Sequence, residues 1–206
     1  NMIFYCCGKG DKIILPRNVH KSVINAMVIC GAEPVYINPG VNPELGISLG
    51  MSVEDIKNAI RENPSAKAVF VNNPTYYGVC SNLKEIVKVA HSAGMLVIVD
   101  EAHGTHFYFG EDMPLSAMDA GADISAISVH KTGGSLTQSS MLLIGDKVDA
   151  EAMRQTINLT QTTSGSYLLM ISLDIARKNL FLNGKEIFKK VSAFAEYARA
   201  EINKIG

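Results

Sequence analysis

The chain has 206 residues, of which 47% are hydrophobic and 19% charged, as in proteins that bury a core. This composition excludes a disordered chain, and 17 glycines and seven prolines are too few for a collagenous one. Nineteen basic and twenty acidic residues give a net charge of -1, which leaves no positive excess to hold a nucleic-acid backbone. We therefore predict one large folded domain that does not bind nucleic acid.

The sequence shows no segment suited to a membrane or to secretion. No apolar run approaches the roughly 20 residues that span a bilayer. Residues 1–7 lack the positive start of a secretory signal and run into a Gly-Lys-Gly-Asp segment at 8–11. The cysteines are irregularly spaced, at Cys6, Cys7, Cys30 and Cys80. We expect reduced, buried thiols and a cytoplasmic protein.

Predicted strands and helices alternate along the chain. In chain order, the first half contains a strand at 12–16, a helix at 20–29 ended by Gly31, a strand at 33–37, an irregular excursion at 39–50, a helix at 52–62 capped by Ser52, a strand at 66–71, a helix at 82–93 capped by Asn82 and a strand at 95–99. The second half contains a helical turn at 115–120, strands at 124–129 and 140–144, and helix after 149 with breaks at 162–166 and 183–184.

Strands that are apolar on both faces and alternate with helices indicate an α/β fold, with a mostly parallel sheet covered by helices on both faces. In such folds ligands bind beyond the carboxyl ends of the strands. This rule selects three loops as the candidate site, at 72–78, 100–106 and 128–134.

The segment Asp100-Glu101-Ala102-His103 matches the second motif of a helicase-type ATPase, which also needs an upstream G-x-x-x-x-G-K-[ST] loop. The only Gly-Lys pair before Asp100 is Gly8-Lys9, and it does not fit that loop, so we set the ATPase aside. Asp100, His103 and His106 have spacings that could gather a metal ion, but no further His or Cys cluster lies near them. We predict no metal site.

Asp100 and Lys131 each follow an apolar strand of the same predicted sheet. A lysine at such a strand end loses hydration, which disfavours its charged form and makes the amine a nucleophile toward a carbonyl. A carboxylate there needs a partner, because burying an unpaired charge is costly. Pyridoxal phosphate would serve both groups, since its aldehyde needs a lysine and its pyridine nitrogen a carboxylate. We therefore predict a pyridoxal phosphate site.

Four segments extend this pattern over the chain: PRNVHKS at 16–22, PTYYGVC at 74–80, VDEAHG at 99–104 and SVHKT at 128–132. Residues 161–164 (QTTS) and 166–168 (SYL) follow in the same order. With these motifs the sequence closely resembles the large, cofactor-binding domain of the Orn/Lys/Arg decarboxylase family, a branch of the fold-type-I pyridoxal enzymes. Each motif is weak alone, but together at family-like intervals they are specific.

The resemblance implies a role for each matching residue: Lys131 forms the Schiff base, Asp100 pairs with the pyridine nitrogen, His20 stacks on the ring, His103 contacts the ring hydroxyl, and Ser128 and His130 reach the phosphate. Two roles stay open on the residues alone. His20 could equally be an ordinary residue at a helix start, and Thr75 suits a turn as well as a cofactor contact.

The reaction that the resemblance implies is decarboxylation of lysine, arginine or ornithine to the corresponding amine and CO₂. Two alternatives stay open: another fold-type-I activity, such as an aminotransferase or a lyase, and a catalytically silent scaffold. The family's upstream phosphate-binding turn and C-terminal domain are not found in this sequence. We therefore expect residues 1–206 to be a partial large domain of a homodimer or higher homo-oligomer, which by itself binds the cofactor weakly or not at all.

Overall fold

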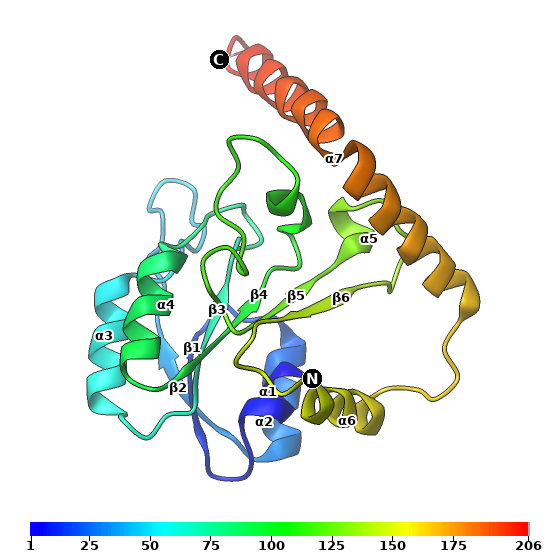
Figure 1. Ribbon diagram of the computed structural model, residues 1–206. Helices are drawn as coiled ribbons and strands as arrows, with labels where there is room; N and C mark the ends of the chain where they lie inside the picture. Colours follow the sequence, from blue (N-terminus) through cyan, green and yellow to red (C-terminus); the bar gives the residue numbers. More distant parts are fainter. Residues whose placement is uncertain (206) are drawn as a thin grey trace.

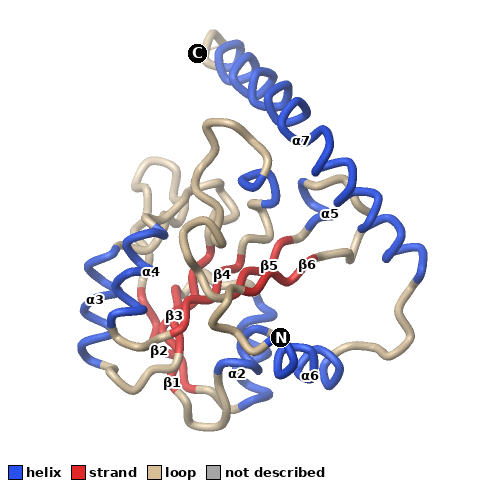
Figure 2. The backbone as a smooth tube through the Cα atoms, viewed as in Figure 1, coloured by secondary structure: helices blue, strands red, loops and turns tan. Residues whose placement is uncertain are grey.

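The computed structural model describes residues 1–205, which form a six-stranded sheet flanked by helices (Figures 1 and 2). The strands lie in the order β2-β1-β3-β4-β5-β6. Their bounds are β1 Lys12–Pro16, β2 Glu33–Ile37, β3 Ala68–Asn72, β4 Leu96–Asp100, β5 Ile124–Ile127 and β6 Met141–Ile144. The first five strands pair in parallel and β6 pairs antiparallel to β5, which confirms the predicted mostly parallel sheet.

Helices cover both faces of this sheet, and their bounds are α1 Met2–Cys6, α2 Lys21–Cys30, α3 Val53–Glu62, α4 Leu83–Ser92, η1 Thr105–Tyr108, α5 Val129–Thr132, α6 Ala150–Thr160 and α7 Tyr167–Ile202. One core cluster joins α3 and α4 to one face of the sheet, and a second joins α1, α2 and α6 to the other (Figure 1). No helix among residues 1–205 combines the length and the apolar character needed to cross a membrane.

The four central strands, β1, β3, β4 and β5, are buried on both faces, which explains their continuous hydrophobic sequences. Successive side chains alternate between the two clusters, since a strand has a period of two. In β4, Val97 and Val99 pack with α3 and α4, whereas Ile98 packs with α2. The same alternation carries on to the strand end, so that Asp100 continues on the face of Ile98.

Several predicted helix ends are confirmed. The Ser52 hydroxyl accepts a hydrogen bond from the backbone N–H of Asp55 at 3.0 Å, and Asn82 caps α4 in the same way. Gly31 ends α2 in the left-handed region, with φ of 74°, a conformation that glycine adopts without strain. The predicted break between α6 and α7 is also present, and residues 39–50 are irregular apart from one bridge between Val41 and Ser48.

The predicted break at 183–184 is wrong, because α7 runs without interruption from Tyr167 to Ile202. Gly184 does not end the helix. It is buried, and an added Cβ would lie 2.9 Å from Cβ of Phe109, so the missing side chain lets the helix approach the loop after η1. Sequence alone does not distinguish a glycine that breaks a helix from one that permits close packing.

The predicted strand at 124–129 is also too long, since β5 ends at Ile127. Val129 to Thr132 form the short helix α5, so Lys131 lies on a helical turn and not directly after the strand. The sequence analysis did not predict α1, η1 or α5.

We expect Gly184→Ala to lower the free energy of unfolding by about 1 kcal/mol, because overpacking costs about 1–3 kcal/mol and exceeds the roughly 1 kcal/mol gain in helix propensity. Urea denaturation followed by circular dichroism measures this difference. The matched control is Asn183→Ala at the exposed neighbouring position, which should leave stability unchanged or raise it slightly. A stabilised Gly184→Ala protein would contradict the packing role.

Candidate active site

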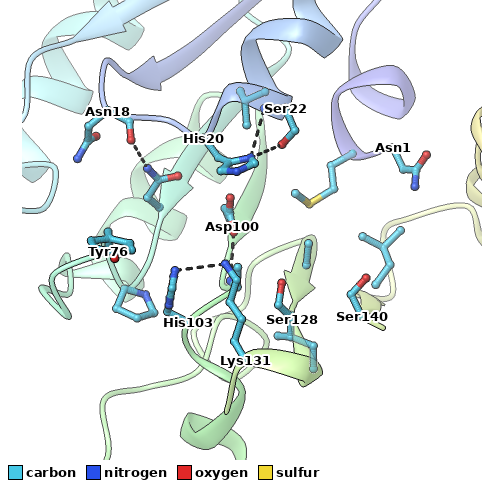
Figure 3. Close-up of a pocket in the computed structure, with 18 residues that line it drawn as sticks. Asn1, Asn18, His20, Ser22, Tyr76, Asp100, His103, Ser128, Lys131 and Ser140 are labelled. Atoms are coloured by element: carbon cyan, nitrogen blue, oxygen red, sulfur yellow. Dashed lines mark hydrogen bonds between the residues drawn. The ribbon is translucent and has the colours of Figure 1, made fainter. Parts of the chain in front are cut away.

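A pocket of about 450 Å³ lies at the carboxyl edge of the sheet, on the side covered by α1 and α2 (Figure 3). The loops that follow β1, β3, β4 and β5 contribute to it, together with the start of α2 and one end of β6. Strand order reverses between β1 and β3, and a crevice at such a switch point is the usual ligand site of α/β sheets. Position alone therefore identifies this pocket as the candidate site.

The floor of the pocket is a row of residues on four neighbouring strands. Asn72 on β3 is the register partner of Asp100 on β4, Asp100 that of Ala126 on β5, and Ala126 that of Leu142 on β6. All four residues line the pocket. Register partners lie about 4.8 Å apart on the same face of a sheet. The row therefore offers a planar ligand one amide, one carboxylate and two apolar side chains.

Asp100 supplies the negative charge of this row. Its Oδ1 accepts a hydrogen bond from the backbone N–H of Ala102 at 3.1 Å, and the side chain is partly buried. Among the described residues Asp100 takes part in no ion pair. A carboxylate that is partly removed from water is stabilised by a nearby donor or cation. The pocket can therefore offer Asp100 to a ligand N–H group.

Lys131 points into the pocket from α5 and donates a hydrogen bond from Nζ to Nε2 of His103 at 3.3 Å (Figure 3). The side chain is exposed, so the loss of hydration expected from a strand end is not found; the amine projects from a helical turn. Lys131 forms no ion pair with a carboxylate among residues 1–205. Its amine is therefore available to a ligand.

His103 lies between Lys131 and Tyr76. Burial is the main cause that lowers the pKa of His103, the positive charge of Lys131 lowers it further, and Asp100 opposes both. A neutral imidazole accepts the hydrogen bond from Lys131 at Nε2 and holds its own proton on Nδ1. The ring of Tyr76 meets the imidazole edge-on, with 5.6 Å between ring centroids.

His20 approaches the pocket from the side opposite Lys131, with Asp100 between the two (Figure 3). It is the N-cap of α2, where Nδ1 accepts a hydrogen bond from the backbone N–H of Ser22 at 3.2 Å and lies 2.8 Å from the Ser22 hydroxyl. His20 was predicted either to stack on the cofactor or to be an ordinary residue at a helix start. The structure is compatible with both interpretations, since the same side chain caps α2 and lines the pocket.

The structure brings five of the seven predicted site residues to one pocket: His20, Asp100, His103, Ser128 and Lys131. His130 and Thr75 do not line it. Nδ1 of His130 pairs with the backbone oxygen of Ser139 at 2.8 Å, and Thr75 is buried and accepts the backbone N–H of Val79 within a turn. Of the two roles considered for Thr75, this geometry is that of the turn.

Asn18, Asn72 and Tyr76 also line the pocket. They lie in the segments 16–22 and 72–78 that the sequence selected, but no role was predicted for any of the three. Nδ2 of Asn72 donates to the backbone oxygen of Asn18 at 2.9 Å, but the Oδ1 atoms of both asparagines are buried and have no partner among the described residues. Buried acceptors without a donor are rare, and at a pocket they indicate a donor supplied by a ligand. Asn72 could have been found as the neighbour of Asp100 in the sheet register, but that register is not visible in the sequence.

These residues fit pyridoxal phosphate. The row across the sheet gives its planar ring a floor, Asp100 is free for the ring nitrogen, Lys131 is free for the aldehyde, and Asn72 has an unused acceptor. The pocket residues suit a metal ion less well than they suit pyridoxal phosphate. In residues 1–205 no group of three or more His, Cys, Asp or Glu side chains is arranged to hold a metal ion.

Solved structures of a lysine decarboxylase and of an aminotransferase share this fold. The constitutive lysine decarboxylase of Escherichia coli superposes with a TM-score of 0.81 over 98% of this chain and 30% of its own, at 23% identity. N-Succinyldiaminopimelate aminotransferase of Mycobacterium tuberculosis superposes with a TM-score of 0.70 over 99% of this chain and 53% of its own, at 17% identity. These likenesses define the fold-type-I architecture that the sequence predicted.

The chain belongs to the Orn/Lys/Arg decarboxylase family, whose major domain matches residues 1–205. Arginine decarboxylase of Bacillus subtilis is 50% identical over 205 residues, and that of Halalkalibacterium halodurans is 51% identical; each match covers 99% of this chain and 42% of the relative. A lysine decarboxylase of Pseudomonas aeruginosa is 29% identical over 82% of this chain and 25% of its own length. The chain thus spans about 42% of the length of its arginine decarboxylase relatives.

We expect Lys131→Ala to raise the pKa of His103, because the substitution removes a positive charge that disfavours the imidazolium. Asp100→Asn should lower the same pKa, since it removes the opposing negative charge. NMR titration of the imidazole C–H signals in the cofactor-free protein measures both shifts, with His103→Gln to assign the resonance. Shifts in the same direction would contradict the described arrangement of charges.

Proposed function

We propose that the whole protein is a pyridoxal phosphate-dependent decarboxylase that converts a basic amino acid to its amine and CO₂. Among the basic amino acids we favour arginine as the substrate. The observation that carries the proposal is that Asp100 and Lys131, from separate elements, line one pocket in which neither forms an ion pair with a described residue. The names of relatives that are about 50% identical favour arginine over lysine or ornithine. Because the chain spans less than half of those relatives, the tests use the full-length protein.

The proposed cofactor contacts follow the geometry of the pocket. Lys131 would bind the aldehyde carbon covalently, Asp100 would accept the ring N–H, and His20 would cover the ring face opposite Lys131. Ser128 would donate to the phosphate. His130 could join it only through Nε2, because Nδ1 is engaged by the backbone of Ser139.

When bound, pyridoxal phosphate supplies an electron sink for the pair of electrons left on the substrate α-carbon as CO₂ departs. The carboxylate of Asp100 would favour the protonated ring nitrogen, because a nearby negative charge stabilises the positive form. Lys131, which enters the pocket from α5, would deliver a proton to the substrate α-carbon. His103 accepts a hydrogen bond from Nζ of Lys131 at Nε2 and would so limit the positions that the amine can take.

We also propose that the full-length protein is a homo-oligomer, at least a dimer, that acts in the cytoplasm. Support comes from α7, which leaves large apolar side chains exposed, among them Phe181, Phe194 and Tyr197. Apolar surface of this extent is uncommon on a single subunit in water. Sedimentation equilibrium of the full-length protein should give at least twice the subunit mass, and a monomer at micromolar concentration would contradict the proposal.

We expect borohydride reduction of the full-length protein with pyridoxal phosphate to fix the cofactor on the peptide that contains Lys131. Lys131→Ala should abolish both this adduct and CO₂ release from arginine, whereas Lys84→Ala, at an exposed position on α4, should change neither. Peptide mass spectrometry and a CO₂ assay with arginine, lysine and ornithine measure the outcome. An unchanged adduct in Lys131→Ala would refute the assignment of Lys131, and keto acid formation without CO₂ would identify an aminotransferase.

A further inference from the structure

We propose that Glu101 is a positioning residue that fixes the loop carrying His103, and through it the contact between His103 and Lys131. The inference rests on the proposed function, because its consequence is the placement of groups around pyridoxal phosphate. Glu101 follows Asp100 directly but does not line the pocket; its side chain is fully buried, with 0% exposure.

Three hydrogen bonds reach the Glu101 carboxylate from three separate parts of the chain. Oε2 accepts the hydroxyl of Tyr108 in η1 at 2.6 Å and the hydroxyl of Ser125 on β5 at 3.0 Å. Oε1 accepts the backbone N–H of Ala117 at 2.8 Å. The long connection between β4 and β5 is therefore fastened at its start, near its middle and toward its end by one side chain.

The fastened loop is the one that reaches the pocket. The backbone N–H of Gly104 donates to the backbone oxygen of Glu101 at 2.8 Å, which closes the turn that presents His103. A Cβ added to Gly104 would lie 2.5 Å from Cγ of Glu101 and 3.1 Å from Cδ of Pro74. The chain thus passes directly over the Glu101 side chain, and a shift of that side chain moves the backbone next to His103.

A second contact, made by Thr105, joins the same loop to α5. Thr105 is buried, with 1% exposure, and its hydroxyl lies 3.5 Å from the backbone oxygen of Ser128, which precedes α5. Its methyl group would be 3.1 Å from a Cβ added to Gly133 at the other end of α5. Thr105 therefore packs against both ends of the helical turn that bears Lys131.

The contacts of the cluster suit a carboxylate better than an amide. All three neighbours can donate to Glu101, and the N–H of Ala117 can only donate. Burial raises the pKa of Glu101, while the hydrogen bonds from Tyr108, Ala117 and Ser125 oppose that shift. A glutamine would put an NH₂ donor in place of Oε2. The hydroxyls of Tyr108 and Ser125, which now donate to Oε2, would then have to accept and turn their own protons toward other groups.

A matched control exists at the opposite edge of the sheet. Asp123, just before β5, is 3% exposed; its Oδ2 accepts the backbone N–H of Val97 at 2.7 Å and lies 2.8 Å from Nε2 of His91. Asp123→Asn removes a buried, hydrogen-bonded carboxylate of the same domain but touches no residue of the pocket. Asp123→Asn therefore shows how a loss of folding stability alone affects cofactor affinity and the pKa of His103.

The test compares Glu101→Gln, Tyr108→Phe and Asp123→Asn in the full-length protein, each measured against wild type. For Glu101→Gln we expect the dissociation constant of pyridoxal phosphate to rise about tenfold or more, because small displacements of contact groups are costly. In the cofactor-free protein, hydrogen exchange of residues 102–117 should quicken, and the pKa of His103 should rise as Lys131 moves away. Tyr108→Phe should change the same readouts less, since it leaves the carboxylate and two of its donors in place.

Asp123→Asn should lower the thermal midpoint without changing the cofactor affinity or the pKa of His103. If Glu101→Gln only lowers the thermal midpoint, as Asp123→Asn does, Glu101 has a structural role alone and the inference is overturned. If Glu101→Gln does not fold, the result for Tyr108→Phe decides in its place. A wild-type protein that carries no cofactor adduct on Lys131 would instead refute the proposed function, so the two failures are distinguishable.

Discussion

The parallel register of β3, β4 and β5 is the constraint on which the candidate site depends. It places Asn72, Asp100 and Ala126 side by side on one face of the sheet, although they are separated by more than 50 residues of sequence from first to last. Hydrogen bonds between the strands and burial on both faces hold this row far more rigidly than loops could. The position of loop residues such as His103 is then set relative to this rigid row of strand residues. The two apolar clusters that clamp the sheet are therefore part of the site, since a register slip would turn Asp100 away from the pocket.

The two opposite charges of the pocket, Asp100 and Lys131, form no ion pair with each other or with another described residue. Asp100 is partly buried, and the only hydrogen bond of its side chain among the described residues comes from the backbone N–H of Ala102. Lys131 is positive but is held by a neutral imidazole, not by a carboxylate. Direct pairing of Asp100 with Lys131 would satisfy both and leave nothing for a ligand. The insertion of His103 beside Lys131, with a pKa lowered by burial and by that lysine, keeps the two opposite charges available for separate atoms of one molecule.

Much of this arrangement could be predicted from the sequence, because the signals were local. Apolar runs gave the six strands, side-chain caps gave the starts of α3 and α4, and short motifs gave Asp100, His103 and Lys131. The errors fall where a distant contact decides the local structure. Gly184 continues α7 because Phe109 packs against it, and α5 begins where β5 was expected to continue. No role was predicted for Asn72, because an asparagine at a strand end is unremarkable until the sheet register places it beside Asp100.

Adjacent acids at the end of β4 show how a strand can serve a pocket and a core at once. Because successive side chains point to opposite faces, Asp100 enters the pocket beside α2, while Glu101 turns toward the face covered by α3 and α4. Their surroundings differ accordingly: among the described residues the side chain of Asp100 accepts one hydrogen bond, and the side chain of Glu101 accepts three. A carboxylate with three donors resists displacement, whereas one with a single donor keeps oxygen lone pairs for a ligand. The two side chains share one backbone, so the anchoring of Glu101 limits the movement of the residue before it. The reactive edge of the sheet and its buried core are thereby coupled through a single peptide unit.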